Sequence, residues 1–204
     1  MAEDLGHRFG RRILFRRLGF TLEGGQALAV TGANGSGKST LVRILAGVLV
    51  PSRGTVTLTA GGRAIPPAQR PLHVGLVAPY LNVYEGFSAR ENLAFLARAR
   101  RLPEAPRRIE AVLEAVELTA RADDLVATYS SGMKQRMRFA AALLADPPLL
   151  LLDEPTANLD APGRAMVSRI VAGALAAGRL VVIATNDAGE AAGCSRILCV
   201  EDYR

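Results

Sequence analysis

Lysine is nearly absent from this sequence of 204 residues, in which only Lys38 and Lys134 occur. Arginine therefore supplies almost all of the 25 basic residues, which face 19 acidic ones and leave a net charge of +6. Such a balance can favour nucleic acid or an acidic membrane surface, although a solvated arginine-rich face is the simpler explanation. The densest basic segment, residues 7–17, is interrupted by four apolar residues, so it is not a disordered basic arm.

Cysteine and long apolar runs are also scarce. Cys194 and Cys199 lack the spacing of a metal site and form no framework of pairs, which suits a reducing compartment. No apolar run reaches the roughly 18–20 residues that a membrane span needs, and residues 1–12 lack the apolar stretch of a signal peptide. We therefore expect a soluble, cytoplasmic chain without tandem repeats, long enough to bury the core of one domain.

The segment "GANGSGKST", residues 32–40, predicts a phosphate-binding loop. An apolar strand precedes it and a helix follows, as such a loop requires. Its three glycines let successive backbone N–H groups converge on phosphate oxygens, and the helix start adds its positive end. Lys38 is expected to reach the β- and γ-phosphates, and the Ser39 hydroxyl to bind Mg²⁺. The residues expected to bind the nucleotide phosphates here are Asn34, Gly35, Ser36, Gly37, Lys38, Ser39 and Thr40.

The wider pattern predicts an α/β protein. Segments 149–153 and 179–186 are continuous apolar runs, typical of strands buried on both faces of a parallel sheet between helices. A helical insertion is expected between about residues 80 and 130, and Ser88 with Glu91 predicts a capping box at the start of its first helix. The expected strands are 26–32, 55–59, 72–78, 149–153, 179–186 and 196–200, and the expected helices are 39–49, 88–102, 106–118 and 132–146.

The segment "LLLLDEP", residues 149–155, supplies the second half of a triphosphatase site. An acid at the end of a buried strand lies beside the phosphate loop in such sheets. Asp153 is expected to hold Mg²⁺ through water, and Glu154 to polarise the attacking water as general base. Two adjacent buried carboxylates without a cation would be expensive, which favours a metal site over a simple acidic turn.

The segment "YSSGMKQR", residues 129–136, predicts a second anion-binding helix start. Either Ser130 or Ser131 can be the N-cap, and Gly132 allows close approach. An ordinary capped helix explains this segment when it is considered alone. The chain already has a phosphate loop, however, so a second helix start of this kind needs another purpose.

These motifs and their order resemble the ATP-binding cassette (ABC) ATPases over nearly the whole chain. The family signature is Leu-Ser-Gly-Gly-Gln followed by basic and Gln residues. Here Ser130 and Gly132 are kept, Ser131 replaces the first glycine and Met133 replaces the glutamine. The resemblance implies a single domain over residues 1–204. Its expected fold is a P-loop NTPase with a RecA-like parallel-sheet core, a small antiparallel β subdomain and an inserted α-helical subdomain.

The resemblance also implies that two copies pack head to tail. Each ATP then lies between the phosphate loop of one copy and residues 130–132 of the other, where Ser130 and Gly132 contact the γ-phosphate. Residues 158–160, "NLD", match the loop that links the two sites. Phe9 matches an aromatic residue that stacks on adenine, but core packing is an equal alternative for it.

The chain departs from the family pattern at two positions. A glutamine normally follows the strand predicted at 72–78, and here Pro79, Tyr80 or Asn82 takes its place. The switch histidine after the late strand is replaced by Asn186, which can bond the γ-phosphate but cannot take a proton. Capping of the following helix is the alternative role of Asn186. We therefore expect hydrolysis of ATP to persist but to be slow.

The expected function is that of the ATPase subunit of a membrane transporter, attached at the inner face of the membrane to separate transmembrane subunits. The short cassette is similar to exporter types, including polysaccharide and drug exporters and the haem-exporter cassette of cytochrome c maturation. A non-transport cassette that acts on nucleic acid or ribosomes is the alternative, although no specific nucleic acid is expected. A small-molecule kinase would leave segments 129–136 and 158–160 without a purpose.

Overall fold

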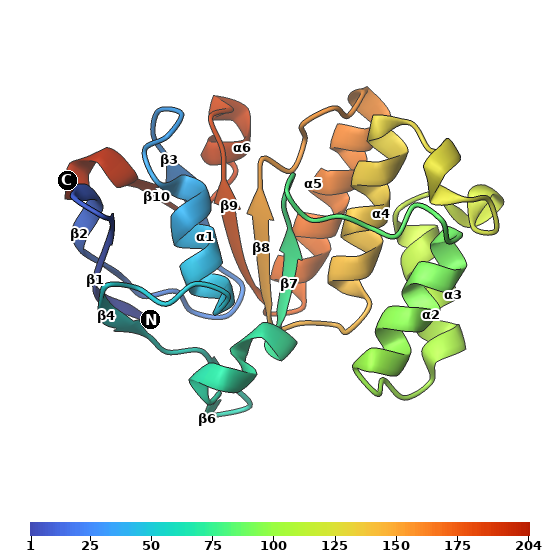
Figure 1. Ribbon diagram of the computed structural model, residues 1–204, viewed down its shortest axis with the longest axis horizontal. Coiled ribbons are helices and arrows are strands. Elements are labelled where there is room, and N and C mark those ends of the chain that lie inside the picture. Colours follow the sequence, from blue (N-terminus) through green and yellow to red (C-terminus); the bar gives the residue numbers. More distant parts are fainter.

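The computed structural model describes residues 1–204, and its centre is a five-stranded parallel sheet with the strand order β10-β3-β9-β8-β7 (Figure 1). All four neighbouring pairs run parallel, so the carboxyl ends of the strands meet at one edge. The expected P-loop NTPase fold with a parallel-sheet core is confirmed. The strands are β3 (Ala27–Thr31), β7 (Val74–Val77), β8 (Leu149–Asp153), β9 (Leu180–Ala184) and β10 (Arg196–Cys199).

Both faces of this sheet are buried, as the continuous apolar runs predicted. Leu149 and Leu151 pack into one hydrophobic cluster with α1 (Lys38–Ala46). Leu150 and Leu152 point to the opposite face and join a second cluster, which also contains residues of α4 (Ser131–Leu143) and α5 (Ala161–Ala176). Alternate residues of one strand thus anchor two separate cores.

A three-stranded antiparallel sheet with the order β2-β1-β4 lies at one side of the molecule, near both chain ends (Figure 1). Its strands are β1 (Ala2–Phe9), β2 (Arg12–Phe20) and β4 (Arg53–Val56). The sequence pattern assigned no strand to residues 2–20, because register shifts between β1 and β2 break the two-residue alternation there. The strand expected at 55–59 is divided between β4 and the hairpin of β5 (Thr59–Ala60) and β6 (Arg63–Ala64).

The helices α2 (Ala89–Ala99) and α3 (Ala105–Ala115) lie on the side of the molecule opposite to the antiparallel sheet, with the parallel sheet between them (Figure 1). The capping box at the start of α2 is confirmed: the Ser88 hydroxyl accepts from the Glu91 N–H, and the Glu91 carboxylate accepts from the Ser88 N–H. The helix α5 was not predicted, and α6 (Ala188–Ala192) is the helix expected to follow Asn186. Short 3-10 helices occupy Pro67–His73, Thr119–Arg121, Val126–Thr128 and Val200–Tyr203.

A glycine lets β7 approach α4 closely. A Cβ on Gly75 would lie 2.5 Å from the backbone oxygen of Ala142, a distance that no real side chain tolerates. The strand and the helix are therefore held together without a layer of side chains between them at this point. None of the helices combines the length and the apolar character that crossing a membrane requires.

Candidate functional site

The phosphate loop connects β3 to α1 at the carboxyl edge of the parallel sheet. Gly32, Gly35 and Gly37 have φ values of 133°, 77° and 117°, which side chains rarely adopt. A Cβ on Gly32 would also lie 2.8 Å from the hydroxyl oxygen of Ser36, which is itself fully buried and without a hydrogen-bond partner. The glycines that the sequence analysis selected are thus required by the conformation of the loop.

Lys38 lies folded over this loop. Its Nζ donates to the carbonyl oxygens of Gly32 (2.7 Å) and Ala33 (3.4 Å) and to Oδ1 of Asn186 (2.9 Å). Only 6% of the residue is exposed, so the ammonium group is held in place rather than hydrated. A bound phosphate can replace these neutral acceptors with charged ones, which form stronger hydrogen bonds.

Asp153 ends β8 beside the loop, and 1% of it is exposed. Burial raises the pKa of its carboxyl group, and the nearby Ser39 hydroxyl and the positive charges of Arg43 and Lys38 only partly oppose this. Neither carboxylate oxygen accepts a hydrogen bond of normal geometry. Two buried oxygens without partners, next to a hydroxyl, fit a divalent cation that takes most of its remaining ligands from phosphate and water.

Replacement of Asp153 by Asn should stabilise the nucleotide-free protein. A buried neutral amide costs less than a buried charge, and an unpartnered polar group typically costs about 1–3 kcal/mol. We expect Tm to rise by roughly 2–4 °C for each kcal/mol recovered. The pKa of Asp153 is raised in the folded state, so its ionisation destabilises the fold as pH rises. The gain from the substitution should therefore be largest above that raised pKa, shrink as pH falls below it, and vanish once pH is below the ordinary carboxyl pKa of the unfolded chain.

Thermal melts of both proteins across a pH series would measure this difference. Asp202→Asn, an exposed carboxylate on the 3-10 helix Val200–Tyr203, is the matched control and should change little. A lower Tm for Asp153→Asn at high pH would show that the carboxylate is stabilised by a partner and would remove the argument for a cation site.

Glu154 follows Asp153 directly and lines the cavity over the phosphate loop. Its backbone is left-handed, with φ of 50°, and its N–H donates to the carbonyl oxygen of Ala184 at 2.9 Å. Burial raises the pKa of its carboxyl group, with Lys38 opposing and Asp153 reinforcing the shift. A carboxylate with a raised pKa beside the phosphate loop is a suitable proton acceptor for water.

Asn186 does not cap the helix that follows it, so that alternative is wrong. Asp187 is the N-cap of α6, and its carboxylate accepts from the N–H groups of Gly189 and Glu190. Asn186 instead accepts from Lys38 and donates through Nδ2 to Oδ1 of Asn34, at 2.8 Å. Its side chain therefore links Lys38 to Asn34 across the phosphate loop.

A cavity of about 460 Å³ opens over the phosphate loop. Phe9 is 53% exposed at its wall, which excludes core packing as its role, and its ring lies nearly perpendicular to the His7 ring, with the two centroids 4.8 Å apart. The position of Phe9 allows stacking on a base. The lining residues are Phe9, Arg12, Leu14, Asn34, Gly35, Gly37, Lys38, Ser39, Thr40 and Glu154.

Two residues that the sequence analysis missed also hold the loop. Arg12 of β2 donates to the carbonyl oxygen of Gly35 at 3.1 Å, and Glu201 accepts from the N–H of Ala33 at 3.3 Å. Arg12 also lines the cavity. They lie 23 and 168 positions from their partners, so no local sequence pattern could have identified them.

Residues 130–132 lie apart from this cavity and line no part of it. Ser130 is the N-cap of α4, where its hydroxyl accepts from the Met133 N–H at 3.2 Å, and Ser131 is the first helical residue. A Cβ on Gly132 would lie 3.3 Å from the carbonyl oxygen of Asn158, so this helix start packs against segment 158–160. One chain alone does not bring the two anion-binding elements together.

Of the three candidates for the missing glutamine, Tyr80 contacts α1, the helix that follows the phosphate loop. The Arg43 guanidinium stacks over its ring at 4.1 Å. Burial raises the pKa of its hydroxyl, and the charge of Asp153 adds to this shift while Arg43 opposes it. Pro79 is exposed, and Asn82 lines a different cavity.

Comparison with known proteins gives a consistent result. The sequence model of the ABC transporter family matches residues 15–157. The Nod factor export ATP-binding protein I of Bradyrhizobium diazoefficiens is 37% identical over 98% of this chain and 67% of its own length. The chain spans 59–67% of the length of such relatives.

Solved structures are similar over almost the entire fold. An ATP-binding subunit of an ABC transporter has a TM-score of 0.87 at 26% identity, covering 97% of this chain and 84% of the other. The dimeric ATP-binding cassette MJ0796, in a post-hydrolysis state with ADP and Pi, has a TM-score of 0.85 at 22% identity, covering 97% and 92%. The second likeness concerns the fold alone.

Proposed function

Because the chain belongs to the ABC transporter family, whose ATP-binding cassettes are ATPases, we propose that it is the ATP-hydrolysing subunit of a membrane exporter. The observation that supports hydrolysis best is the pair of partnerless Asp153 oxygens beside Lys38 and Glu154, at one edge of the sheet. This arrangement supplies a candidate cation site at the end of β8, next to a phosphate-binding charge and a base that both line the cavity.

The residues divide the work of hydrolysis among them. The phosphate-loop N–H groups and Lys38 bind the β- and γ-phosphates, and Lys38 offsets the negative charge that develops on the leaving group. Ser39 and Asp153 would hold Mg²⁺, which when bound supplies further positive charge to the phosphate oxygens. Glu154 accepts the proton of the water that attacks the γ-phosphorus, and its raised pKa brings it nearer the working pH.

In this proposal Asn186 occupies the position of the family's switch histidine, but its side chain cannot accept or donate a proton in the reaction. Its amide already connects Lys38 and Asn34, so it can orient the γ-phosphate. Asn186→His should raise kcat for ATP, by up to about 10²-fold if the imidazole acts as acid–base partner. Steady-state phosphate release at saturating ATP would measure the change, with Kd for ATP as the control. An unchanged or lower kcat would show that the asparagine does not limit turnover.

A complete site requires two copies in this proposal. Residues 130–132 lie outside the cavity of their own chain, and a head-to-tail partner would place them over the γ-phosphate bound by the other phosphate loop. The α4 helix start, with its free backbone N–H groups, is chemically suited to that contact. The dimeric form of a cassette with the same fold supports this arrangement.

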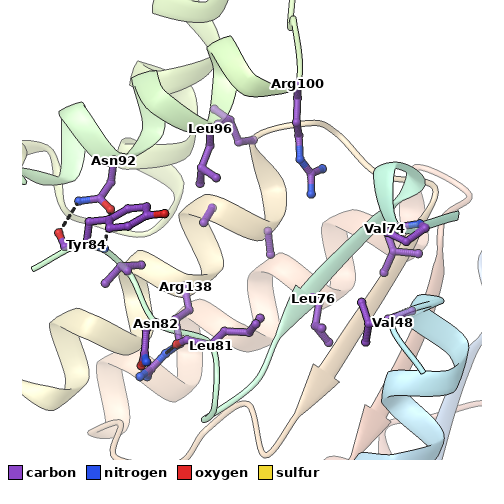
Figure 2. A pocket seen from close by; sticks show the side chains of 16 residues that line it. Val48, Val74, Leu76, Leu81, Asn82, Tyr84, Asn92, Leu96, Arg100 and Arg138 are labelled. Atoms are coloured by element: carbon purple, nitrogen blue, oxygen red, sulfur yellow. Dashed lines mark hydrogen bonds between the residues drawn. The ribbon is translucent and has the colours of Figure 1, made fainter. Parts of the chain in front are cut away.

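Membrane partners would dock at a second cavity, of about 320 Å³, which we term the subunit groove (Figure 2). It lies between the parallel-sheet core and α2, and its walls are mostly apolar. Three partly exposed aromatic residues stand beside it: Tyr84 contacts the rings of Phe87 and Phe95 at centroid distances of 5.7 and 5.5 Å. Exposed aromatic residues next to an apolar groove are typical of an interaction site. The groove is lined by Ala46, Val48, Pro71, Val74, Leu76, Leu81, Asn82, Val83, Tyr84, Asn92, Leu96, Arg100, Arg138, Ala141, Ala142 and Leu144.

We propose export as the direction of transport, and attachment to the inner face of the membrane through these partners. The relatives named for Nod factor export support this direction. Haem is the cargo implied by the resemblance to the haem-exporter cassette, and Nod factor is the one named in the relatives. The cargo would be selected by the membrane subunits.

Purification of the chain together with its membrane subunit would test the proposal. Mg-ATP hydrolysis by the complex and ATP-dependent accumulation of a cargo in inverted vesicles are the expected results. Salt-sensitive binding of DNA or RNA by the purified chain, without any membrane partner, would favour the nucleic-acid alternative instead.

A further inference from the structure

Arg100 is the charged group in the subunit groove that has no partner. It forms the C-cap of α2, and its side chain points from the end of that helix into the groove (Figure 2). Its Nη1 is buried and makes no hydrogen bond, and no carboxylate lies within ion-pair distance of the guanidinium. Burial lowers the pKa of the guanidinium, as expected for a cation that lacks compensation.

The other polar groups of the groove are already satisfied or neutral. Arg138 donates through Nε to the carbonyl oxygen of Leu81 (2.8 Å) and through Nη1 to Gln135 (2.9 Å). Asn92 exchanges two hydrogen bonds with the backbone of Tyr84, each of 2.9 Å. The lining contains two arginines and no acidic residue, so the field in the groove is positive and only Arg100 has a buried donor free.

We propose that the membrane-subunit segment that docks in the subunit groove carries an acidic side chain, and that this side chain pairs with Arg100. The inference rests on the proposed function, which supplies a membrane partner. A carboxylate completes the bonding of a guanidinium in a way that neutral groups do not, because both of its oxygens can accept in parallel. The apolar walls around it exclude water and would strengthen the pair.

The dependence of binding on a negative charge in the docking segment can be measured on the full chain with synthetic peptides. Two amphipathic, leucine-rich helical peptides would differ only by a central Glu or Gln, and NMR titration of the labelled chain would give both Kd values. We expect the Glu peptide to bind about tenfold or more tightly, and this preference to disappear in Arg100→Gln. Arg100→Glu should prefer a peptide with Lys at that position. Arg98→Gln, an exposed residue of the same helix, should keep the wild-type preference.

Equal affinity of the wild-type chain for both peptides, or no shift of groove resonances with either, would overturn the inference. Arg100→Gln should also melt at the same or a higher temperature than wild type, since no native hydrogen bond is lost. A clearly lower Tm would show a structural role for Arg100 and would count against the proposal.

Co-purification from membranes separates this inference from the proposed function. Loss of a membrane subunit on Arg100→Glu, with recovery when an acidic residue of its docking segment is changed to Arg, would support both. Retention of that subunit by Arg100→Glu would leave the transporter function standing and overturn the pairing. A peptide preference without any co-purified membrane subunit would support the carboxylate chemistry and count against the transporter function.

Discussion

Replacement of Glu154 by Gln should lower kcat for ATP by about 10²–10⁴-fold, the usual contribution of a general base. The residue lies one position beyond Asp153, at the wall of the cavity over the phosphate loop. Its left-handed backbone and the hydrogen bond of its N–H to Ala184 fix the direction in which the carboxylate leaves the chain. Glutamine keeps the size and polarity of this side chain and removes only its ability to accept a proton.

ATP binding should survive the Glu154→Gln change, with Kd altered by no more than a few-fold. Single-turnover phosphate release would give the chemical rate, and size-exclusion chromatography with Mg-ATP should show accumulation of a dimer that cannot hydrolyse its nucleotide. Glu190→Gln is a matched control, because this carboxylate influences Glu154 electrostatically but lies outside the cavity. Normal turnover by Glu154→Gln would show that another group is the base.

Replacement of Lys38 by Met should weaken ATP binding by about 10²–10⁴-fold. Two charge-assisted hydrogen bonds to phosphate would be lost, each worth about 1.5–3 kcal/mol, and every 1.4 kcal/mol changes Kd about tenfold. The ammonium is held in readiness by Gly32 and Asn186, so little ordering is required when phosphate arrives. Isothermal titration calorimetry with ATP would measure the loss.

The scarcity of lysine supplies an unusually direct control for this experiment. Lys134, the other lysine, pairs with Glu85 away from the cavity. Lys134→Met should leave Kd for ATP unchanged within a few-fold. Equal losses in both variants would indicate a general effect of charge rather than a contact with phosphate, and an unchanged Kd in Lys38→Met would contradict the proposed site.

Local sequence patterns were sufficient wherever the deciding contacts are local. The bends of the phosphate loop depend on glycines within six positions of one another, and the capping box depends on Ser88 and a residue three positions later. The buried strand β8 was predictable because both of its faces are covered, which leaves an uninterrupted apolar run.

The rest depended on contacts between distant segments. The bridge from Asn186 to Asn34 joins residues 152 positions apart, and the stacking of Arg43 on Tyr80 could not be inferred from spacing. The helix α5 was missed because its apolar residues are spread around the helix rather than gathered on one face, although Asp160 at its N-cap and a proline in its first turn were available signals. The exposure of Phe9 depends on how β1 packs. This could not be inferred from the sequence, because the register shifts in β1 interrupt the alternation of buried and exposed residues.

The tight contact at Gly75 has a mechanical consequence. Because β7 and α4 touch backbone to backbone there, and Arg138 of α4 also holds the loop at Leu81, the helix cannot slide without displacing that loop. Ser130 caps one end of α4, while residues nearer its other end and Leu81 line the groove. In the proposed dimer, a force on the first turn of α4 from the nucleotide bound by the partner copy would therefore be transmitted along the helix. It would displace the groove-lining residues against which we propose that a membrane subunit docks.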